Sequence, residues 1–387
     1  MILIRYGEIA LKSPRIRLEW EKQLIRNIKS ILELNNISYK NIKFLPTRGR
    51  IFLDIKLTSN ICSLLKKVSG IISFSEVLEA SNEINSISKV TLKLADQILE
   101  NGDTFALKVR RTGTHNYSSI DIARIVGKNV LTTFSDRNIS VNLSSPKRTI
   151  YIEIRDKNSY IFHNKISGMG GLPIGTQGKV IALISGGIDS PVAAWMMMKR
   201  GCYIRPIYFD NYPYLSKKNI DKVINLIKKL RTFDPRKKFY FYIIPHGPNL
   251  ELFLKNAPKN YTCLLCKRML YRIAEVITKK EKAKAIVTGE NLGQVASQTI
   301  DNLYILNDSI KIPVFRPLIG LDKEEIIDIA KKIGTFKIST EFIDSCTAVP
   351  KFPITKGDIN KVIKFESDIN IDNLVKNAIN NMKKVYI

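Results

Sequence analysis

The sequence is poor in the residues that build secreted, fibrous or membrane proteins. Its 387 residues include only 5 Cys, 2 Trp, 20 Gly and 15 Pro, too few for a disulfide framework, a collagen-like chain or a low-complexity protein. It has no run of roughly 18 or more apolar residues to cross a membrane, and the opening Met1 to Tyr6 lacks the layout of a signal peptide. We therefore expect a cytoplasmic protein with reduced cysteines and no membrane contact.

Positive charge is what the sequence has in excess. Lys and Arg number 62 against 35 Asp and Glu, which gives a net charge of +27. Such an excess favours a polyanionic partner, because each neutralised phosphate releases condensed counterions, although a general enrichment in Lys would give the same total. The excess is uneven: residues 101–170 hold 11 basic and 5 acidic residues, whereas residues 61–100 hold 4 and 5. This distribution favours nucleic acid as the partner.

Residues 1–60 and 61–166 mix helices and strands without regular alternation. In the first stretch, apolar residues at helical spacing over 18–34 lie between extended segments. In the second stretch the patterns predict two helices and three strands, at 90–99, 120–133, 105–109, 139–143 and 149–154. We therefore expect two small α+β domains, one in each stretch.

Residues 167–178 separate these stretches from the remainder. Five Gly and one Pro between positions 168 and 178 break both helical and strand periodicity. From residue 179 onward, short apolar strands alternate with amphipathic helices, beginning with a strand at 180–184. This alternation predicts a parallel, Rossmann-type sheet over 179–387, with ligands bound beyond the carboxyl ends of its strands.

A loop that suits a phosphate group follows the first of these strands. The sequence SGGIDS at 185–190 contains two glycines, which allow a tight turn with exposed N–H groups, and the next helix adds partial positive charge. Asp189 or Ser190 alternatively serves only as the N-cap of that helix, with Pro191 at its first position. Gly178 and Lys179 precede the strand and lack the other residues of a Walker loop, which excludes a P-loop NTPase.

Several motifs together resemble those of one enzyme family. SGGIDS resembles the signature of the PP-loop ATP pyrophosphatases, which release pyrophosphate while they adenylate a substrate. Further matching segments are RYGEIALK at 5–12, VNLSSPKRTIYIEI at 141–154, GMGGLPIG at 168–175, TGENLGQVASQT at 288–299 and RPL at 316–318. With these, essentially the whole sequence resembles the tRNA 4-thiouridine synthetase family, also called the tRNA sulfurtransferase or ThiI family.

The resemblance implies a fold and a function. The fold is a multidomain α/β and α+β protein: a ferredoxin-like domain at 1–60, a THUMP RNA-binding domain at 61–166, a linker at 167–178 and a PP-loop domain of the adenine nucleotide α-hydrolase type at 179–387. The function is ATP-dependent sulfur transfer to tRNA, in which the uridine at position 8 is adenylated and its O4 is replaced by sulfur. Alternatives are another PP-loop tRNA thiolase or adenylase, sulfur transfer to a thiazole-forming carrier protein of thiamine biosynthesis, and a non-enzymatic RNA-binding protein.

The resemblance also implies roles for residues around the loop. Asp189 would orient Mg²⁺ or the pyrophosphate leaving group. ATP would be held by Leu183, Ile184, Ser185, Gly186, Gly187, Ser190, Tyr208, Phe209, Lys267, Gly289 and Gln298. Alternatively, Gly289 is only a strand-end turn, and Tyr208 and Phe209 are only core residues.

Three of the cysteines are candidates for sulfur chemistry. Cys263 and Cys266 stand three positions apart at the start of a predicted helix, on one face and near its positive end, where thiolates are favoured. Two buried apolar side chains are the alternative reading of this CxxC. Cys62 and Cys202 lie in apolar contexts and are expected in the core. Cys346 aligns with the catalytic cysteine of the family.

The route by which sulfur arrives is left open. Many family members continue into a rhodanese domain that delivers sulfur, whereas this sequence ends at Ile387. Its CxxC makes it similar to the rhodanese-less type, which implies a [4Fe–4S] or [3Fe–4S] cluster held by Cys263, Cys266 and Cys346, with one iron of a cubane free to bind sulfide. A Zn²⁺ site, which would need a fourth ligand, and metal-free persulfide chemistry are the alternatives. Three histidines lie in settings that do not suggest that ligand: His115, His163 and His246.

Basic and aromatic residues suited to RNA gather in the THUMP-like stretch. They are Lys108, Arg110, Arg111, His115, Tyr117, Arg124, Lys128, Lys147 and Arg148. Any one of them is alternatively part of an ordinary solvated surface. The expected partners are tRNA and a sulfur donor, either sulfide or the persulfide of a cysteine desulfurase, and a homodimer is left open.

Overall fold

The computed structural model describes residues 1–45, 49–343 and 345–387. The chain forms two compact units, one of residues 1–21 and 36–170 and the other of residues 22–35 and 171–387. No helix within the described ranges is long and apolar enough to cross a membrane.

The first sheet of the N-terminal unit is antiparallel, with strand order β10-β4-β1-β3-β2. Its strands are β1 (Ile2–Arg5), β2 (Ile42–Leu45), β3 (Arg50–Leu53), β4 (Ser73–Glu76) and β10 (Ile166–Ser167), with the short helix α2 (Ser59–Leu65) between β3 and β4. All residues of β1 and β3 are buried, so this central pair supplies the core of the sheet. The sheet continues past residue 60, where the sequence placed a domain boundary, because β4 pairs with β1.

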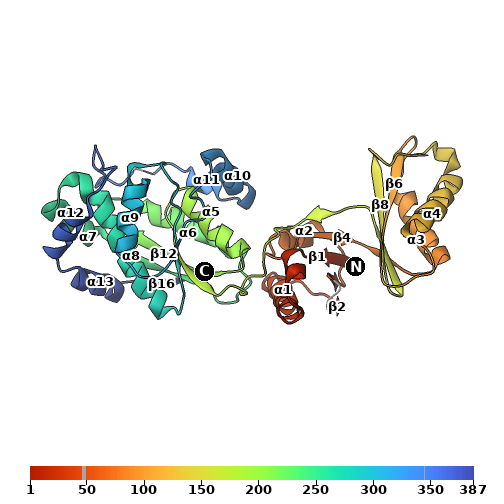
Figure 1. Ribbon diagram of the computed structural model, residues 1–387, viewed down its shortest axis with the longest axis horizontal. Coiled ribbons are helices and arrows are strands. Elements are labelled where there is room, and N and C mark those ends of the chain that lie inside the picture. Colours follow the sequence, from red (N-terminus) through yellow and green to blue (C-terminus); the bar gives the residue numbers. More distant parts are fainter. Residues whose placement is uncertain (46–48, 344) are drawn as a thin grey trace. The chain divides into compact units, whose positions relative to one another are not determined.

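The second sheet of the same unit has strand order β5-β9-β8-β6-β7. Its strands are β5 (Leu78–Ser81), β6 (Thr104–Thr112), β7 (Ser140–Val141), β8 (Arg148–Arg155) and β9 (Asn158–Phe162). Helices α3 (Ile84–Ile98) and α4 (Ser119–Thr133) lie side by side against the sheet (Figure 1). Ile87, Ile122 and Ile150 from the two helices and β8 are fully buried in the core between these layers.

A buried carboxylate ties the two sheets of this unit together. Glu153 on β8 pairs with Arg5 of β1 at 3.0 Å and Arg50 of β3 at 2.9 Å, as well as with Arg155 at 3.2 Å. Burial alone would raise the pKa of Glu153, but the three guanidinium groups outweigh it and lower the pKa to about 2. A small apolar cluster also connects the two sheets, and it includes Phe52 from the first sheet and residues of β9 from the second.

The second unit is built on a six-stranded sheet of order β15-β14-β11-β12-β13-β16. Its strands are β11 (Lys179–Leu183), β12 (Tyr203–Asp210), β13 (Tyr240–Pro245), β14 (Ile286–Val287), β15 (Val314–Phe315) and β16 (Lys383–Tyr386). The first five are parallel, as the sequence predicts, whereas β16 pairs antiparallel with β13 at the edge. The carboxyl ends of the parallel strands therefore face one side, where the loop after β11 begins.

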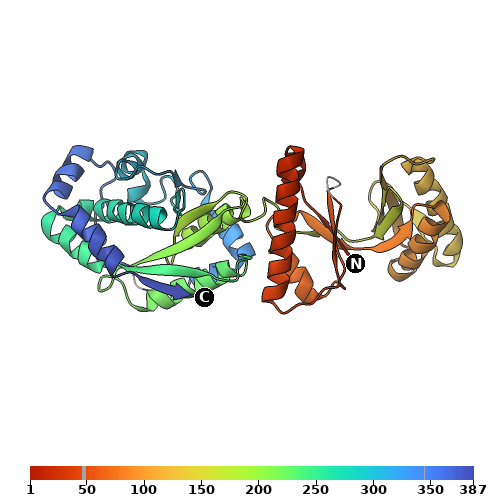
Figure 2. The ribbon, with the colours of Figure 1, turned by 90° about the horizontal axis from the view of Figure 1, so that it is seen from below.

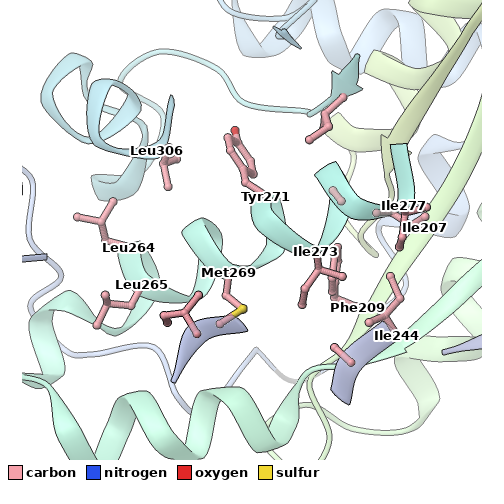
Figure 3. Packing of buried hydrophobic residues seen from close by; sticks show 14 of the residues in the cluster. Ile207, Phe209, Ile244, Leu264, Leu265, Met269, Tyr271, Ile273, Ile277 and Leu306 are labelled. Carbon is pink, nitrogen blue, oxygen red and sulfur yellow. The ribbon is translucent and has the colours of Figure 1, made fainter. Parts of the chain in front are cut away.

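Helices cover this sheet on its two faces (Figures 1 and 2). They are α5 (Asp189–Lys199), α6 (Lys218–Arg231), α7 (Gly247–Asn256), α8 (Thr262–Lys280), α9 (Ile300–Asp308), α10 (Lys323–Ile333), α11 (Phe336–Ser339), α12 (Ile359–Ser367) and α13 (Ile371–Asn380). Helix α8 carries most of the core on its side: Leu264, Met269 and Ile273 pack with strand residues such as Ile207 and Ile244 (Figure 3). Burying each such side chain stabilises the fold by roughly 1.5–3 kcal/mol, which fixes the first turn of α8 beside the strand ends.

The long helix α1 (Pro14–Leu34), red in Figure 2, is divided between the two units. Its residues from Lys22 onward belong to the second unit. There Gln23 and Asn27 both donate from their side-chain amides to the carbonyl oxygen of Ile174, at 3.1 and 3.0 Å. The Gly-rich segment after β10 is thus held by hydrogen bonds to α1.

Candidate functional site

The loop between β11 and α5 is held by hydrogen bonds between its own serines. The Oγ of Ser190 accepts from the backbone N–H of Ser185 at 2.8 Å and lies 3.0 Å from the Ser185 Oγ. A Cβ atom on Gly186 would lie 2.4 Å from the side-chain oxygen of Asn219, so only glycine fits at this point of the turn. The serines therefore close the loop, and the glycines leave its backbone open on the other side.

Helix α5 begins at Asp189 without a side-chain cap. Its N-cap residue is Ile188, which supplies no capping hydrogen bond. The alternative in which Asp189 or Ser190 is the N-cap and Pro191 opens the helix is therefore wrong. The N–H groups of the first turn have no capping side chain, which suits an anion-binding helix end.

Two adjoining cavities lie at this loop, with volumes of about 420 and 230 Å³. Leu183, Ser185, Gly187 and Leu270 line both. Among the residues expected to hold ATP, the larger cavity is also lined by Ile184, Gly186, Tyr208 and Phe209, and the smaller by Ser190, Lys267, Gly289 and Gln298. The structure thus brings the whole expected nucleotide set to one place, with Asp189 in the smaller cavity and Cys346 in the larger.

Asp189, which lines the smaller cavity, has two side-chain partners. Its Oδ1 accepts from the Nζ of Lys323 at 2.6 Å, and its Oδ2 accepts from the side-chain amide of Gln294 at 3.0 Å. Lys323 is the second residue of the Asp322-Lys323 pair that opens α10. A carboxylate and an ammonium group therefore stand together at the start of α5.

A second buried carboxylate, Glu290, organises the cationic wall of the smaller cavity. It accepts from Lys267 at 3.3 Å, Arg316 at 2.7 Å, Tyr271 at 2.6 Å and Thr288 at 3.1 Å. Burial would raise the pKa of Glu290, but Lys267 and Arg316 outweigh it and hold the pKa below its usual value. Glu290 fixes Lys267 in place, a role that the sequence analysis did not assign.

Gly289 and Gln298 complete that wall. A Cβ atom on Gly289 would lie 2.6 Å from the backbone nitrogen of Ser190, so the end of β14 approaches the start of α5 closely, and this is more than a strand-end turn. Gln298 is 9% exposed, and its Oε1 has no hydrogen-bond partner among the described residues. A buried acceptor without a protein partner in a cavity wall is available to a bound molecule.

Tyr208 and Phe209 are both core residues and cavity residues. Tyr208 is 3% exposed and its hydroxyl accepts from the side-chain amide of Asn219 at 2.9 Å, while Phe209 belongs to the main core cluster. Both also line the larger cavity. The two interpretations offered by the sequence therefore do not exclude each other.

The three candidate cysteines lie within electrostatic reach of one another. Burial raises the pKa of the Cys263 thiol, and Cys346 raises it further, while Lys267 opposes this in part. Burial also raises the pKa of Cys266, with added contributions from Cys263 and Cys346. The expectation that these cysteines are favoured as thiolates is not met, because burial raises the pKa of both.

His246 was missed by the sequence analysis, which found no metal-site setting around it. It directly follows β13, and its Nε2 lies 3.2 Å from the Sγ of Cys266. Burial lowers the pKa of His246 to about 3, so the ring is neutral. Its position directly after a parallel strand is the one signal that would have pointed to it.

The other cysteines and histidines lie elsewhere. Cys202 is buried, as expected, and Cys62 is partly buried in α2. His115 and His163 belong to the N-terminal unit, with their Nε2 atoms near the carbonyl oxygen of Asp156 and the side chain of Asn164. Among the described residues, no three His, Cys, Asp or Glu side chains are arranged to hold a metal ion, so neither the Zn²⁺ alternative nor the expected iron–sulfur cluster has a preformed site.

Comparison with protein families assigns the three regions of the chain. The ThiI ferredoxin-like domain matches residues 1–75, the THUMP domain matches residues 81–164, and the thiamine biosynthesis protein (ThiI) model matches residues 175–371. A probable tRNA sulfurtransferase from Methanosarcina mazei is 42% identical over 381 residues, which cover 98% of this chain and 93% of the relative. The chain belongs to the tRNA sulfurtransferase (ThiI) family. Another probable tRNA sulfurtransferase, from Thermoanaerobacter sp., is 40% identical and covers 97% of both chains.

Solved structures place the fold in the same family. A crystal structure of a 4-thiouridine synthetase–RNA complex with bound ATP matches with a TM-score of 0.89 and 33% identity, covering 100% of this chain and 99% of that one. A protein from Pyrococcus horikoshii matches with a TM-score of 0.66 and 27% identity, covering 86% of this chain and 99% of that one. The expected fold class and the expected sulfurtransferase activity on tRNA are confirmed.

In this sulfurtransferase the residues expected to bind RNA lie on different faces of the THUMP sheet. Lys108 and Arg110 alternate with buried or half-buried positions on β6 and are exposed on one face. The side chain of Arg111 lies on the opposite face of the sheet, with its guanidinium carbon 5.8 Å from the ring centre of Tyr117. Tyr117 also stacks on His115 and donates to the carbonyl oxygen of Asn82.

The remaining members of the RNA set are distributed over the same domain. Arg124 is exposed on α4. Lys147 and Arg148 both pair with the buried carboxylate of Asp103, at 2.5 and 3.3 Å. Part of their charge is therefore already balanced within the protein, which makes Lys108 and Arg110 the stronger candidates for binding phosphate.

Proposed function

We propose that this sulfurtransferase uses ATP to activate the uridine at position 8 of tRNA and replaces its O4 by sulfur. The observation that carries the proposal is the convergence at the carboxyl end of β11. There the open SGGIDS backbone, the uncapped start of α5 and the residues from β12, α8 and β14 line the same two cavities as Asp189 and Cys346.

For the nucleotide, we place the phosphates over the loop and the first turn of α5. Backbone N–H groups of Gly186 and Gly187 and the side chain of Ser190 supply donors, and the unpaired Oε1 of Gln298 supplies an acceptor. The larger cavity, with Tyr208 and Phe209 in its wall, would accept the adenosine part. Its volume lies within the range of small-molecule pockets, roughly 300–1,000 Å³.

The first chemical step is attack of uridine O4 on the α-phosphorus of ATP. The bond from that phosphorus to the bridging oxygen breaks, pyrophosphate leaves with the electron pair, and the N3 proton of the uracil is released. Lys323 and Lys267 stand where they would offset the negative charge that develops on the phosphates. Asp189 would bind Mg²⁺ through its carboxylate, which is the type of ligand that this ion prefers.

In the second step, a sulfur nucleophile attacks C4 of the adenylated base. AMP leaves with the C4–O4 electron pair, and the proton of hydrosulfide balances the one lost from N3. Cys346 lines the same cavity as the nucleotide residues. We therefore propose that sulfur reaches the adenylated base from the side of the cavity where Cys346 lies.

The expected iron–sulfur cluster would bring together Cys263, Cys266 and Cys346, whose thiols are close enough for Cys263 and Cys346 to contribute to the raised pKa of Cys266. As thiolates the three would repel one another, and Lys267 offsets this repulsion in part. A [4Fe–4S] cluster held by Cys263, Cys266 and Cys346 would supply compensating positive charge and one iron open to a sulfur donor, whereas in a [3Fe–4S] cluster the three cysteines would ligate all three irons. The alternative is metal-free persulfide chemistry on Cys346.

For the sulfur donor we propose sulfide, with a desulfurase persulfide as the alternative. Anaerobic assays that supply either sulfide alone or a cysteine desulfurase with cysteine distinguish the two. Sulfur transfer to a thiazole-forming carrier protein is a further prediction, which formation of a thiocarboxylate on the carrier would test. A homodimer is another, which the mass of the protein in solution would test.

The adenylation step is tested by pyrophosphate release with ATP and unmodified tRNA. Asp189→Ala should abolish release and leave tRNA affinity nearly unchanged, because the expected RNA residues belong to the other unit. Normal release by this variant would contradict the proposed phosphate site. Separately, Cys346→Ala should lose thiolation and retain release, since Cys346 does not bind phosphate in the proposal.

A further inference from the structure

Two short segments of the second unit form part of the wall of the larger cavity. Asn211 and Leu215 line it from the loop between β12 and α6, and Ile343 lines it from the residues after α11. We call residues 211–215 and 341–343 the rim of this cavity. The rim lies where the proposed function brings the adenylated base, because residues expected to bind ATP line the same cavity.

Hydrogen bonds join the two segments of the rim at two points. The Nζ of Lys222, a buried lysine of α6, donates to the carbonyl oxygen of Glu341 at 2.7 Å. The backbone N–H and the Oγ1 of Thr347 both donate to the carbonyl oxygen of Tyr214, at 2.8 and 3.2 Å. These contacts lie before and after Ile343 in the sequence, so they hold the two segments beside each other at the cavity.

Each segment of the rim exposes one aromatic ring. Phe342, directly before Ile343, is 91% exposed, more than any other large apolar side chain in the part of the chain that the structure describes. Tyr212, directly after Asn211, is 50% exposed, and the Nζ of Lys217 lies 4.5 Å from its ring centre. One exposed apolar residue is ordinary, but two rings on joined segments beside a substrate cavity indicate a contact surface.

The reaction of this family requires a surface of that kind. An enzyme that modifies a base must turn the base out of its stack to reach the reacting atom, and the neighbouring bases then lose a stacking partner. Aromatic side chains replace that stacking whatever the sequence, because every base has a π-face. Lys217 and Lys218 are exposed at the start of α6, which adds positive charge that suits the RNA backbone.

We infer that Phe342 and Tyr212 are positioning residues for the RNA: their rings stack on the bases adjoining uridine 8 and hold the uridine turned toward the larger cavity. The inference rests on the proposed function, which makes uridine 8 the target. Neither ring contacts ATP or the reacting atoms in this scheme. The rings therefore affect how often the uridine reaches the cavity, and ATP binding does not depend on them.

The first test measures kcat/KM for tRNA in 4-thiouridine formation by the full-length protein with ATP, Mg²⁺ and sulfide. Phe342→Leu and Tyr212→Leu remain apolar but lose the ring, and we expect each to lower kcat/KM about 10-fold. Phe342→Tyr and Tyr212→Phe keep a ring and should stay near the wild type. Phe352→Leu and Tyr386→Leu are the matched controls, because these rings are also exposed but lie outside the rim. ATP affinity, measured by calorimetry, should be the same in all of them.

A second test separates stacking from a general defect of the rim. It repeats the measurement with two synthetic tRNAs that each carry an abasic nucleotide on one side of uridine 8. If a ring stacks on the missing base, the wild type loses activity with that tRNA, and the Leu variant of that ring loses little more. A ring that only supports the local structure would lower kcat/KM by the same factor with intact and abasic tRNA, which would contradict stacking.

The outcomes distinguish this inference from the proposed function. Wild-type protein that forms no 4-thiouridine at position 8 would overturn both. Normal thiolation by the wild type and by both Leu variants would overturn this inference alone. Equal losses in the Leu variants and in the variants that keep a ring would contradict stacking. Variants that are normal with sulfide but defective with a cysteine desulfurase and cysteine would assign the rings to a docking protein instead of RNA.

Discussion

Lys323 donates to the carboxylate of Asp189 across 2.6 Å, although the two residues are 134 positions apart. We expect Lys323→Met to reduce ATP-dependent pyrophosphate release by one or two orders of magnitude, because the variant loses a cation that would face the transferring phosphates. Lys331→Met on the same helix is the control, since Lys331 pairs with Asp328 on an exposed surface. Equal rates in the two variants would show that Lys323 only balances Asp189.

The close approach of Gly289 to Ser190 makes a sharp steric prediction. Gly289→Ala would bring a methyl group within 2.6 Å of the Ser190 backbone nitrogen and displace the start of α5. We expect loss of ATP binding, measured by calorimetry, with tRNA affinity retained. Gly320→Ala is the control, because a Cβ atom there meets no atom within 4 Å.

The alternation along β6 divides the residues expected to bind RNA. Replacing Lys108 and Arg110 together by Ala should weaken tRNA binding and reduce its salt slope by roughly one unit for each phosphate that is no longer neutralised. Arg111→Ala should have a smaller effect, since Arg111 lies against Tyr117. The double variant Lys89→Ala and Lys93→Ala removes the same charge from exposed positions of α3 and is the control. If the salt dependence of tRNA binding is unchanged in the β6 variant, Lys108 and Arg110 do not contact phosphate and are ordinary solvated surface residues.

Glu153 should make the N-terminal unit sensitive to acid. Because its pKa is lowered from 4.5 to about 2 in the folded state, its contribution is fully present above about pH 4.5 and is lost as the pH falls toward 2. Its size is about 3 kcal/mol. Glu153→Gln should therefore lower the urea midpoint of this unit at pH 7, and its difference from the wild type should narrow in acid. Glu79→Gln, at an exposed position of β5, should change the midpoint little at either pH.

Local patterns in the sequence predicted the parts of the fold that depend on local chemistry. The alternation after residue 179 predicted the parallel sheet, and SGGIDS predicted a phosphate loop, because both are set by neighbouring residues. The edge strand β16 was not predicted, since its sequence KKVY is short and half charged and becomes a strand only by pairing with β13. The hydrogen bonds from Gln23 and Asn27 of α1 to Ile174 likewise could not be predicted, because they join residues far apart in the chain.

The candidate site shows the same limit. Most of the expected nucleotide residues lie at or just after the carboxyl ends of parallel strands, so their convergence could be predicted from the topology of the sheet. Glu290 and His246 could not be assigned, because their contacts are with partners brought together only by folding: Lys267 and Arg316 for one, Cys266 for the other. Burial of the cysteines, which reverses the expected effect of the helix end on their pKa, also depends on the tertiary structure.

The most direct test of the proposed function follows sulfur into tRNA. Unmodified tRNA is incubated anaerobically with the reconstituted protein, ATP, Mg²⁺ and sulfide, and the nucleosides are analysed by mass spectrometry alongside the pyrophosphate released. We predict 4-thiouridine at position 8 in an amount matched by pyrophosphate, with neither product formed by Asp189→Ala. Thiolation without ATP, or by Asp189→Ala at the wild-type rate, would contradict adenylation at the SGGIDS loop.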